Sequence, residues 1–408
     1  MNVLKNAAVV AAAALITAGA AMGVCAAEPV AVEDLKVGVI YVGDENEGYT
    51  LSHMTGIDAM QVALGLSDDQ VIEKFNIPED ESCYDAAVDL AEQGCQIIFG
   101  TSFGHEDYLI QAASEYPDVE FSHATGYQAA TSELENMHNY FTSIYEARYV
   151  SGVVAGLKLA EQIEAGVPTD ANYDADGNLK IGYVGAFSYQ EVISGFTSFF
   201  LGIRSVVPNV VMEVKYTGSW ADQALEKETA EALIADGCFL IGQHADTTGA
   251  AAACEAAGVW HVGYNVGMLD VAPNYDLTSS TNSWGPYYTY AVQSVVNGDP
   301  IDTDWCKGHT EDAVFITELG QNVADGTEEK VDETWAAIDD GSLKVFDTST
   351  WTVGGETITT TATDDLADLY FGVEHISEDG SYFMESEVGS APAFAFIIDG
   401  ITELNQLY

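Results

Sequence analysis

The chain has 408 residues, with 65 acidic against 12 basic side chains and a formal net charge of −53 at pH 7. This length is typical of two or three domains that each bury their own core. The charge argues against nucleic acid or an anionic membrane as a partner, and the acids are spread between apolar runs, so they do not form a disordered acidic tail.

Residues 1–27 are predicted to be a signal peptide, because a lysine is followed by a long run rich in Ala and Val and then by small residues. We therefore expect an exported protein, at the cell surface or in the periplasm. No other stretch is apolar for long enough to span a bilayer. Cys25 is a candidate for lipid attachment, and cleavage after Ala27 is the alternative.

The remainder of the chain shows one pattern twice. In each copy an apolar run comes first, and a helical stretch ending in Gly-Cys leads into a second apolar run. A loop of small residues, an Ala-rich helix and a further short strand follow. The two copies comprise 36–43, 94–95, 97–99, 100–104 and 119–121, and then 180–185, 237–238, 239–241, 243–249 and 260–263. This order predicts an α/β fold of two Rossmann-like lobes with parallel sheets and helices on both faces, produced by domain duplication.

Ligands of open α/β sheets bind at the carboxyl ends of the strands. Two such lobes therefore predict a ligand cleft between them.

Five cysteines lie beyond the signal peptide, an odd number. Disulfides Cys83–Cys95 and Cys238–Cys254 are one interpretation, and buried thiols that pack as small apolar groups are the favoured one. Cys306 has no evident partner, and no Cys/His spacing indicates a metal site.

The loop Gly100-Thr101-Ser102-Phe103-Gly104 is a G-x-S-x-G sequence between a strand and a helix. It allows a secreted serine hydrolase in which Ser102 attacks and His244 or His261 is the base. The chain lacks an oxyanion-loop glycine cluster, and the equivalent loop of the second copy has no serine. A simpler interpretation is that backbone N–H groups and hydroxyls around Ser102, Phe103 and Gly104 bind a polar ligand group.

Aromatic side chains follow strands or turns at several places, beside small polar residues rather than within apolar helical stripes. Flat ligands such as purines bind by stacking between such rings. His53 is a further candidate for ligand binding, and a structural role is the alternative for it. Arg148 is expected to pair with a buried acid. The aromatic candidates for the cleft are Tyr49, Phe103, Phe187, Trp220 and Trp284.

Together these motifs resemble the basic membrane protein family of solute-binding proteins, the purine-nucleoside-binding lipoprotein group of ABC importers. The resemblance extends from about Lys36 to about Val345. The segments that carry it are 99–104, 116–127, 145–156, 185–193, 218–222, 243–246 and 284–288.

The resemblance implies a type I periplasmic-binding-protein fold with crossovers between the lobes and a closing hinge. It places the family's aromatic stacker at Tyr49 and a polar neighbour at Thr50, with a second-lobe ligand loop that includes His244 and Asp246. It also gives the expected domains: lobe I at 35–145 plus 283–310, lobe II at 146–282 plus 311–350, and a C-terminal extension, 351–408, that packs on the lobes.

Asn265 and Gly267 stand where the family usually has acids that hold ribose hydroxyls. This difference favours a nucleobase or another flat polar solute. We expect a solute-binding protein outside the cytoplasm, not an enzyme and without a cofactor, that captures a purine nucleobase or nucleoside and delivers it to an ABC permease. A ligand sensor with the same fold is an alternative.

Overall fold

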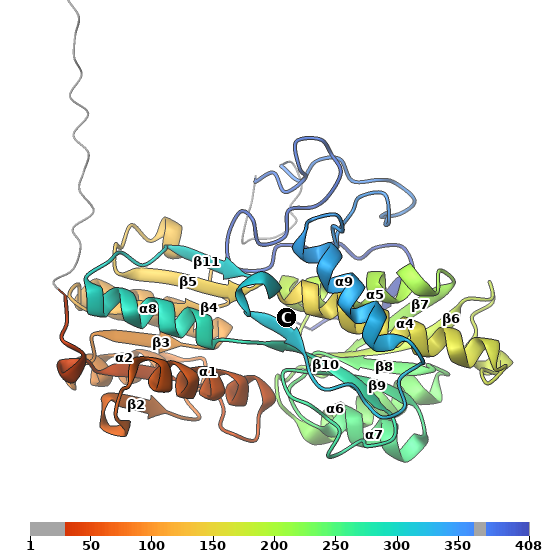
Figure 1. Ribbon diagram of the computed structural model, residues 1–408, viewed down its shortest axis with the longest axis horizontal. Helices are drawn as coiled ribbons and strands as arrows, with labels where there is room; N and C mark the ends of the chain where they lie inside the picture. The colour runs from red at the N-terminus through yellow and green to blue at the C-terminus, as the bar shows by residue number, and fades with distance from the viewer. Residues whose placement is uncertain (1–28, 363–372, 408) are drawn as a thin grey trace, which may run out of the picture.

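The computed structural model describes residues 29–362 and 373–407. Two lobes, each built on one sheet, lie next to each other along the long axis of the molecule (Figure 1). The predicted signal peptide, 1–27, and the lipid-attachment candidate Cys25 lie outside the described residues. None of the helices in the described ranges has the length and apolar character needed to cross a membrane.

Lobe I contains a six-stranded parallel sheet in the order β11-β5-β4-β3-β1-β2. Its interior strand β1, which lies between β3 and β2, is buried at every position, as expected for a parallel strand covered on both faces. The strands are β1 (Val37–Ile40), β2 (Val71–Lys74), β3 (Ile97–Gly100), β4 (Glu120–Ala124), β5 (Met137–Thr142) and β11 (Asp304–Lys307). The helices are α1 (Gly48–Leu64), α2 (Glu81–Glu92), α3 (Glu106–Glu115) and α8 (Gly285–Asn297).

Lobe II contains a seven-stranded sheet in the order β12-β10-β9-β8-β6-β7-β13, in which only β12 runs antiparallel among the described strands. The strands are β6 (Leu179–Gly185), β7 (Val210–Tyr216), β8 (Leu240–Gln243), β9 (Trp260–Tyr264), β10 (Asp276–Asn282), β12 (Val314–Ile316) and β13 (Ile401–Glu403). The helices are α4 (Ile144–Glu164), α5 (Gln190–Val206), α6 (Gln223–Ala235), α7 (Gly249–Ala257) and α9 (Thr327–Asp339). Short 3-10 turns are η1 (Val32–Asp34), η2 (Asp68–Gln70), η3 (Phe103–His105), η4 (Ala129–Thr131), η5 (Asp170–Asn172) and η6 (His309–Glu311).

The duplicated Gly-Cys pairs have the same structural role in both lobes. Gly94 and Gly237 follow α2 and α6 with φ of +85° and +96°, the left-handed conformation that commonly ends a helix. Cys95 and Cys238 come next and are each 2% exposed, immediately before β3 and β8. All five cysteines in the described ranges are free thiols, so the predicted disulfides are wrong. The buried-thiol interpretation is confirmed for four of them, whereas Cys306 is half-buried.

Three segments cross between the lobes, after β5, after β10 and after β11. They are hydrogen-bonded to one another: the Thr142 hydroxyl donates to Asn282 at 2.5 Å, and the Ser143 N–H donates to the Lys307 carbonyl at 2.9 Å. The Ser283 N–H donates to the Ala313 carbonyl at 2.8 Å. The crossovers therefore form one connected strip about which the lobes can move.

Helices α4 and α5 pack unusually closely, because glycines lie at their contact. A Cβ atom at Gly152 would lie 2.2 Å from the Phe199 carbonyl oxygen, and one at Gly202 would lie 2.1 Å from the Tyr149 carbonyl oxygen. The close packing brings Arg148 of α4 beside the first turns of α5, where a Cβ atom at Gly195 would lie 3.4 Å from its Nε. This contact positions one side of the cleft between the lobes.

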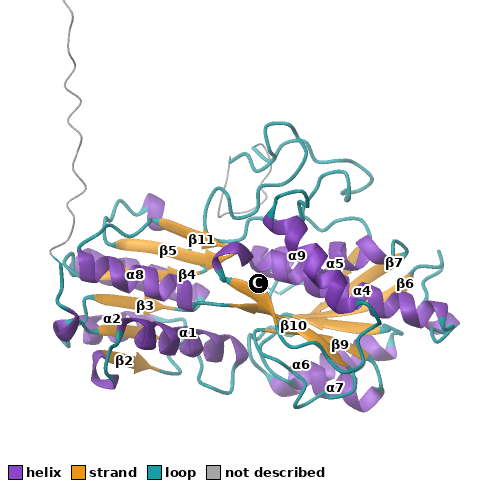
Figure 2. Ribbon diagram, viewed as in Figure 1, coloured by secondary structure: helices purple, strands orange, loops and turns teal. Residues whose placement is uncertain are grey.

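The chain beyond α9 is mostly loop and lies over the junction of the two lobes (Figure 2). Its buried aromatic rings pack together and join the main core. Its end forms β13, which pairs in parallel with β7 and adds an edge strand to lobe II. The sequence did not indicate this strand. The buried rings are Phe346, Trp351, Phe383, Phe394 and Phe396.

Candidate functional site

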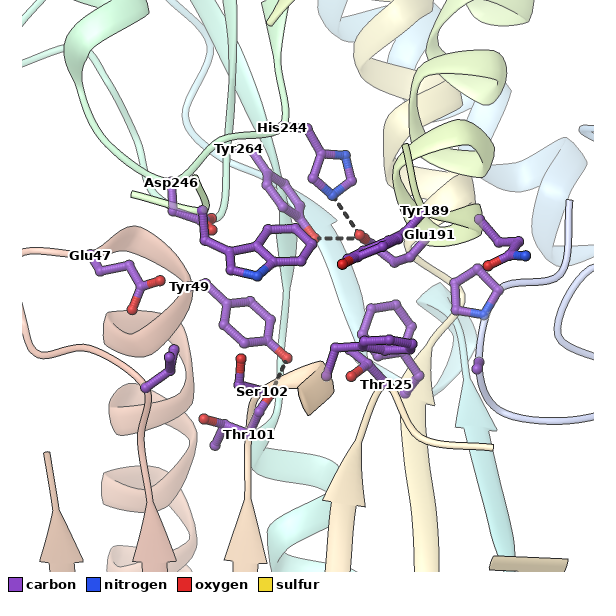
Figure 3. A pocket seen from close by; sticks show the side chains of 17 residues that line it. Glu47, Tyr49, Thr101, Ser102, Thr125, Tyr189, Glu191, His244, Asp246 and Tyr264 are labelled. Atoms are coloured by element: carbon purple, nitrogen blue, oxygen red, sulfur yellow. Dashed lines mark hydrogen bonds and ion pairs between the residues drawn. The ribbon is translucent and has the colours of Figure 1, made fainter. Parts of the chain in front are cut away.

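A cavity lies between the lobes, at the carboxyl ends of the strands of both sheets (Figure 3). Its walls come from the loops after β1, β3, β4, β6, β7 and β8, which is where open α/β sheets bind ligands. The lining residues are Val42, Glu47, Tyr49, Thr101, Ser102, Phe103, Thr125, Phe141, Tyr189, Gln190, Glu191, Trp220, His244, Asp246, Tyr264, Ala391 and Pro392.

Aromatic rings from both lobes face this cavity. Tyr49, in the first turn of α1, is held in place because its hydroxyl donates a hydrogen bond to the Thr101 carbonyl at 2.8 Å. Phe103 of lobe I stacks on Tyr189 of lobe II with ring centroids 5.3 Å apart, so these rings meet across the lobe boundary. Trp220 supplies a further ring from the loop after β7.

The lobe II wall is a buried network centred on Glu191. The Glu191 carboxylate accepts hydrogen bonds from His244 Nε2 at 2.7 Å and from the Tyr264 hydroxyl at 3.4 Å. Behind them, Arg148 donates to the Gln243 carbonyl at 2.8 Å and contacts His244 Nδ1 at 3.0 Å. Its guanidinium carbon lies 3.6 Å from the centroid of the Tyr264 ring. Arg148 is a donor only, so His244 Nδ1 accepts and Nε2 carries the proton.

The charges in this network fix its protonation. Burial alone would raise the pKa of Glu191, but His244, Arg148 and the Tyr264 hydroxyl outweigh burial and hold the pKa below its ordinary value. Burial lowers the pKa of His244, and the positive charge of Arg148 lowers it further against the effect of Glu191. At neutral pH the cavity therefore presents an ionised Glu191, an acceptor for N–H or O–H groups of a ligand.

Asp246 and Glu47 form a second acidic group, opposite Glu191 in the cavity (Figure 3). Burial raises the pKa of Asp246 well above its ordinary value, and the Glu47 charge raises it further. Burial also raises the pKa of Glu47. The lobes are joined beside these acids, because the N–H of Gly48, the residue after Glu47, donates to the Asp246 carbonyl at 2.9 Å. Both carboxyls therefore have a pKa above that of an exposed acid.

Six of the predicted site residues line the cavity, and the other six do not. Thr50 donates to the Glu47 carboxylate, and the Gly104 N–H donates to Glu79 at 2.8 Å. Phe187 stacks on Tyr189 with ring centroids 5.3 Å apart. The lining residues among those predicted are Tyr49, Ser102, Phe103, Trp220, His244 and Asp246.

Asn265 supports the wall from behind instead of lining it. Its amide Nδ2 donates to Asp246 Oδ1 at 2.8 Å, and its Oδ1 accepts from Asn282 at 3.0 Å. Both polar atoms of the side chain are thus used within the protein. Asn265 orients Asp246, so the acidic groups of this cavity come from Asp246 and Glu191 rather than from the 263–268 segment.

His53 and Trp284 are packed in the core of lobe I, away from the cavity. Both side chains are 0% exposed, and their rings stack with centroids 4.1 Å apart. The Trp284 N–H donates to the Ser52 hydroxyl at 3.0 Å, and His53 Nδ1 pairs with the Tyr288 hydroxyl at 2.6 Å. The structure therefore assigns both rings to the α1–α8 contact, within the interior of the lobe.

Sequence reasoning missed four prominent side chains of the cavity: Glu47, Tyr189, Glu191 and Tyr264. The repeat contained a signal for two of them, because Tyr189 and Glu191 follow β6 as Glu47 and Tyr49 follow β1. No local signal pointed to Ala391 and Pro392, which reach the cavity from the far end of the chain.

Ser102 does not have the contacts of a hydrolase nucleophile. Its hydroxyl donates to Glu79 at 2.7 Å, and its backbone is extended with φ −104° and ψ 148°. Of the two predicted bases, His244 is engaged with Glu191, while His261 contacts Asp276 at 2.8 Å. The residues predicted for a catalytic triad therefore do not assemble into one.

The cavity has a volume of about 50 Å³. A protein cavity of about 150 Å³ holds benzene, and a purine has two fused rings. A purine is therefore accommodated only when the lobes separate or the lining side chains move.

Three buried glutamates make stability depend on pH. Burial raises the pKa of Glu146, Glu226 and Glu385 to about 7. An unfolded glutamate titrates near pH 4.3, so between these values the folded state holds protons that the unfolded state has released. As pH rises from 6 to 7, the three glutamates should therefore lower the free energy of unfolding by about 3 kcal/mol in total. Histidines whose pKa burial lowers act in the opposite direction over the same window, namely His53, His105, His123, His244 and His375. Thermal unfolding at fixed ionic strength measures this slope.

A control variant separates these glutamates from other titrating groups. It replaces all three with glutamine, which keeps the side-chain shape and removes the titration. We expect the free energy of unfolding of that variant to rise from pH 6 to 7 relative to that of the wild type, because the destabilising ionisation of the three carboxyls is gone and the contribution of the histidines remains. Parallel profiles for the wild type and the variant over this window would contradict the assignment.

The comparisons with known proteins agree with this architecture. Residues 35–345 match the model of a family described as ABC transporter substrate-binding protein, PnrA-like. A purine-binding protein of Brucella abortus is 34% identical over 336 residues, which cover 80% of this chain and 89% of that protein. A Haloferax volcanii protein described as a candidate ABC transporter glucose-binding protein is 34% identical over 258 residues, covering 63% of this chain and 60% of that one.

Solved structures show the same fold at lower identity. An ABC transporter solute-binding protein from Aeropyrum pernix has a TM-score of 0.61 at 17% identity and covers 76% of this chain and 93% of that one. Another solute-binding protein, from Conexibacter woesei, has a TM-score of 0.58 at 20% identity and covers 76% of this chain and 98% of that one. The predicted fold class, a type I periplasmic-binding fold with two α/β lobes, is confirmed. The chain belongs to the PnrA-like family of ABC transporter substrate-binding proteins.

Proposed function

We propose that this protein captures a purine nucleobase or nucleoside in the cavity between its lobes, outside the cytoplasm, and delivers it to an ABC permease. The observation that carries the proposal is the composition of the cavity: aromatic faces from both lobes surround buried carboxylates. A flat heterocycle would stack on the rings while its edge groups bond to the acids. The purine-binding relative supports the same choice.

Glu191 and Asp246 would bind different groups of the ligand. Glu191 accepts hydrogen bonds from ring or amino N–H groups, or from sugar hydroxyls. Asp246 has a raised pKa and accepts from Asn265 through Oδ1, so Oδ2 is its free atom for the ligand. A protonated Asp246 can also donate to a ring nitrogen. A ligand that left these buried groups unpaired would lose about 1–3 kcal/mol for each one.

Capture requires no bond chemistry. A ligand that touches both lobes favours the closed form in a population shift. Closure makes the Gly48–Asp246 backbone bond and the Phe103–Tyr189 stack, which both join the lobes. A receptor for a sensory system would use the same capture step, so delivery to a permease is the part of the proposal that rests on family membership.

A sugar is the second candidate, because the Haloferax relative is described as glucose-binding and sugars also combine ring stacking with carboxylate acceptors. Purines expose two flat aromatic faces and few hydroxyls, whereas glucose presents hydroxyls around its whole edge. Binding of glucose with no purine binding would replace the purine proposal and leave the cavity assignment in place.

Removing the Tyr49 ring should weaken purine binding. We expect Tyr49→Ala to lower the affinity about 10- to 100-fold, because one stacking face and its contact area are lost. Isothermal titration with adenine and guanosine measures the change. Tyr49→Phe is the matched control: it keeps the ring and loses only the bond to the Thr101 carbonyl, so most of the affinity should remain. Equal affinities for wild type and Tyr49→Ala would show that the ring does not face the ligand.

A further inference from the structure

Part of the cavity wall comes from a segment that the family model does not reach. The match ends at residue 345, yet Ala391 and Pro392 line the cavity with the loops of both lobes. The described chain after α9 passes over the lobe junction (Figure 1). The substrate cavity of this protein is therefore completed by its own C-terminal segment.

The segment is anchored to lobe II just before it reaches the cavity. The buried Glu385 carboxylate accepts a hydrogen bond from the Ser194 hydroxyl of α5. The other oxygen of Glu385 accepts from the N–H groups of Ala393 and Phe394, at 3.0 and 2.9 Å. One carboxylate thus closes residues 385–394 into a loop and fixes both ends of that loop against α5, the helix that carries Glu191.

The same loop is also bonded to lobe I. Asp304 of β11 accepts from the Ser390 N–H at 3.2 Å and from its hydroxyl at 3.0 Å. Ser390 is 1% exposed. Burial raises the pKa of Asp304, against the effect of the bonds from Ser390. Ser390 immediately precedes the cavity residues, so the bond to lobe I and the contact with the cavity belong to one short stretch.

The rest of the chain is joined to lobe II near the cavity. Strand β13 pairs with β7, and the Ser188 N–H donates to the Leu407 carbonyl at 2.7 Å while the Leu407 N–H donates to the Ser188 hydroxyl at 3.0 Å. Ser188 precedes Tyr189 of the cavity wall. Because both flanks of the loop are fixed to lobe II, its bonds to Asp304 must break when the lobes separate fully.

We propose that residues 385–394 form a bridge between the lobes that restrains their opening and, through Ala391 and Pro392, limits the size of the ligand that the cavity accepts. The ligand class rests on the proposed function, whereas the restraint on opening does not. Because Pro392 narrows the cavity from this side, we expect the bridge to favour nucleobases, which are smaller than nucleosides.

The restraint is tested without a ligand, by small-angle X-ray scattering of the purified protein at fixed ionic strength. Asp304→Ala removes both bonds to Ser390, and we expect a larger radius of gyration than for the wild type. Ser390→Ala removes one of the two bonds and should give a smaller increase in the radius of gyration. This variant tests the restraint if Asp304→Ala folds poorly. Asp302→Ala, at an exposed position of the same segment, is the matched control. Scattering from Asp304→Ala and Ser390→Ala that is identical to wild type would overturn the bridge.

The effect on ligand size is tested by titrating wild type and Pro392→Ala with adenine and with adenosine. We expect the ratio of adenosine to adenine affinity to rise at least fivefold in Pro392→Ala. An unchanged ratio in a protein that binds either ligand would overturn the sizing role. Binding of neither by the wild type would instead refute the purine function, and scattering would then decide the bridge on its own.

Discussion

Replacing Arg148 with alanine is expected to destabilise the folded protein by about 1–3 kcal/mol, because it leaves buried hydrogen-bond acceptors without a donor. Arg148 is 2% exposed and donates to the Gln243 carbonyl. Its charge also helps to hold Glu191 ionised. Without the guanidinium, the carbonyl loses a donor and the Glu191 carboxylate loses a nearby cation. Denaturant unfolding of wild type and variant at pH 7 measures the loss.

Two controls identify the cause. Arg148→Lys keeps a positive charge but cannot reproduce the planar fork that reaches two acceptors and stacks on Tyr264, so we expect an intermediate loss. Lys227→Ala breaks an exposed ion pair with Glu231 and should change stability by less than about 1 kcal/mol. A loss below about 1 kcal/mol for Arg148→Ala would show that the network around Glu191 does not depend on this cation.

Gly152→Ala is expected to destabilise the protein by about 1–3 kcal/mol through overpacking. Helix propensity alone predicts the opposite sign, since alanine is favoured over glycine inside a helix by about 1 kcal/mol. The new Cβ atom would lie 2.2 Å from the Phe199 carbonyl oxygen, which belongs to the backbone of α5 and cannot rotate away. The helices must therefore separate. Thermal unfolding gives the sign directly.

Glu164→Ala serves as the control, because Glu164 is exposed at the end of the same helix. It should leave stability nearly unchanged. Gly202→Ala, which makes the reciprocal contact with the Tyr149 carbonyl, should resemble Gly152→Ala. A more stable Gly152→Ala would mean that α4 and α5 are not in close contact. The separation should also reduce ligand binding, since α4 carries Arg148 and α5 carries Glu191.

The repeat made the fold predictable. Each copy contains its own strands, a Gly-Cys helix ending and a small-residue loop, and these local features are sufficient to place ligand groups at the carboxyl ends of parallel strands. For that reason Tyr49 and Trp220 could be selected from the order of residues along the chain, whereas Asp246 was selected through the family resemblance. All three line the cavity. Phe103 could be selected in the same way as the two rings, because it follows the end of strand β3 closely.

Other side chains could not be placed, because their positions depend on long-range packing. Trp284 also follows a strand, but a Cβ atom at Gly56 would lie 2.7 Å from Trp284 Cβ, so α1 approaches closely and encloses the ring. Asn265 has left-handed φ of +61° and turns toward Asp246 rather than toward a ligand. Pro392 reaches the cavity from a segment that is distant in sequence from the lining residues of both lobes.

The most direct test of the account is a thermal-shift titration of the purified protein with adenine, guanine, adenosine, guanosine and glucose, with Tyr49→Ala in parallel. A ligand that binds only the folded state raises the melting temperature by mass action. We predict a concentration-dependent rise with at least one purine, little rise for Tyr49→Ala, and none with glucose. A rise with glucose alone, or no rise with any purine, would contradict purine capture between the lobes.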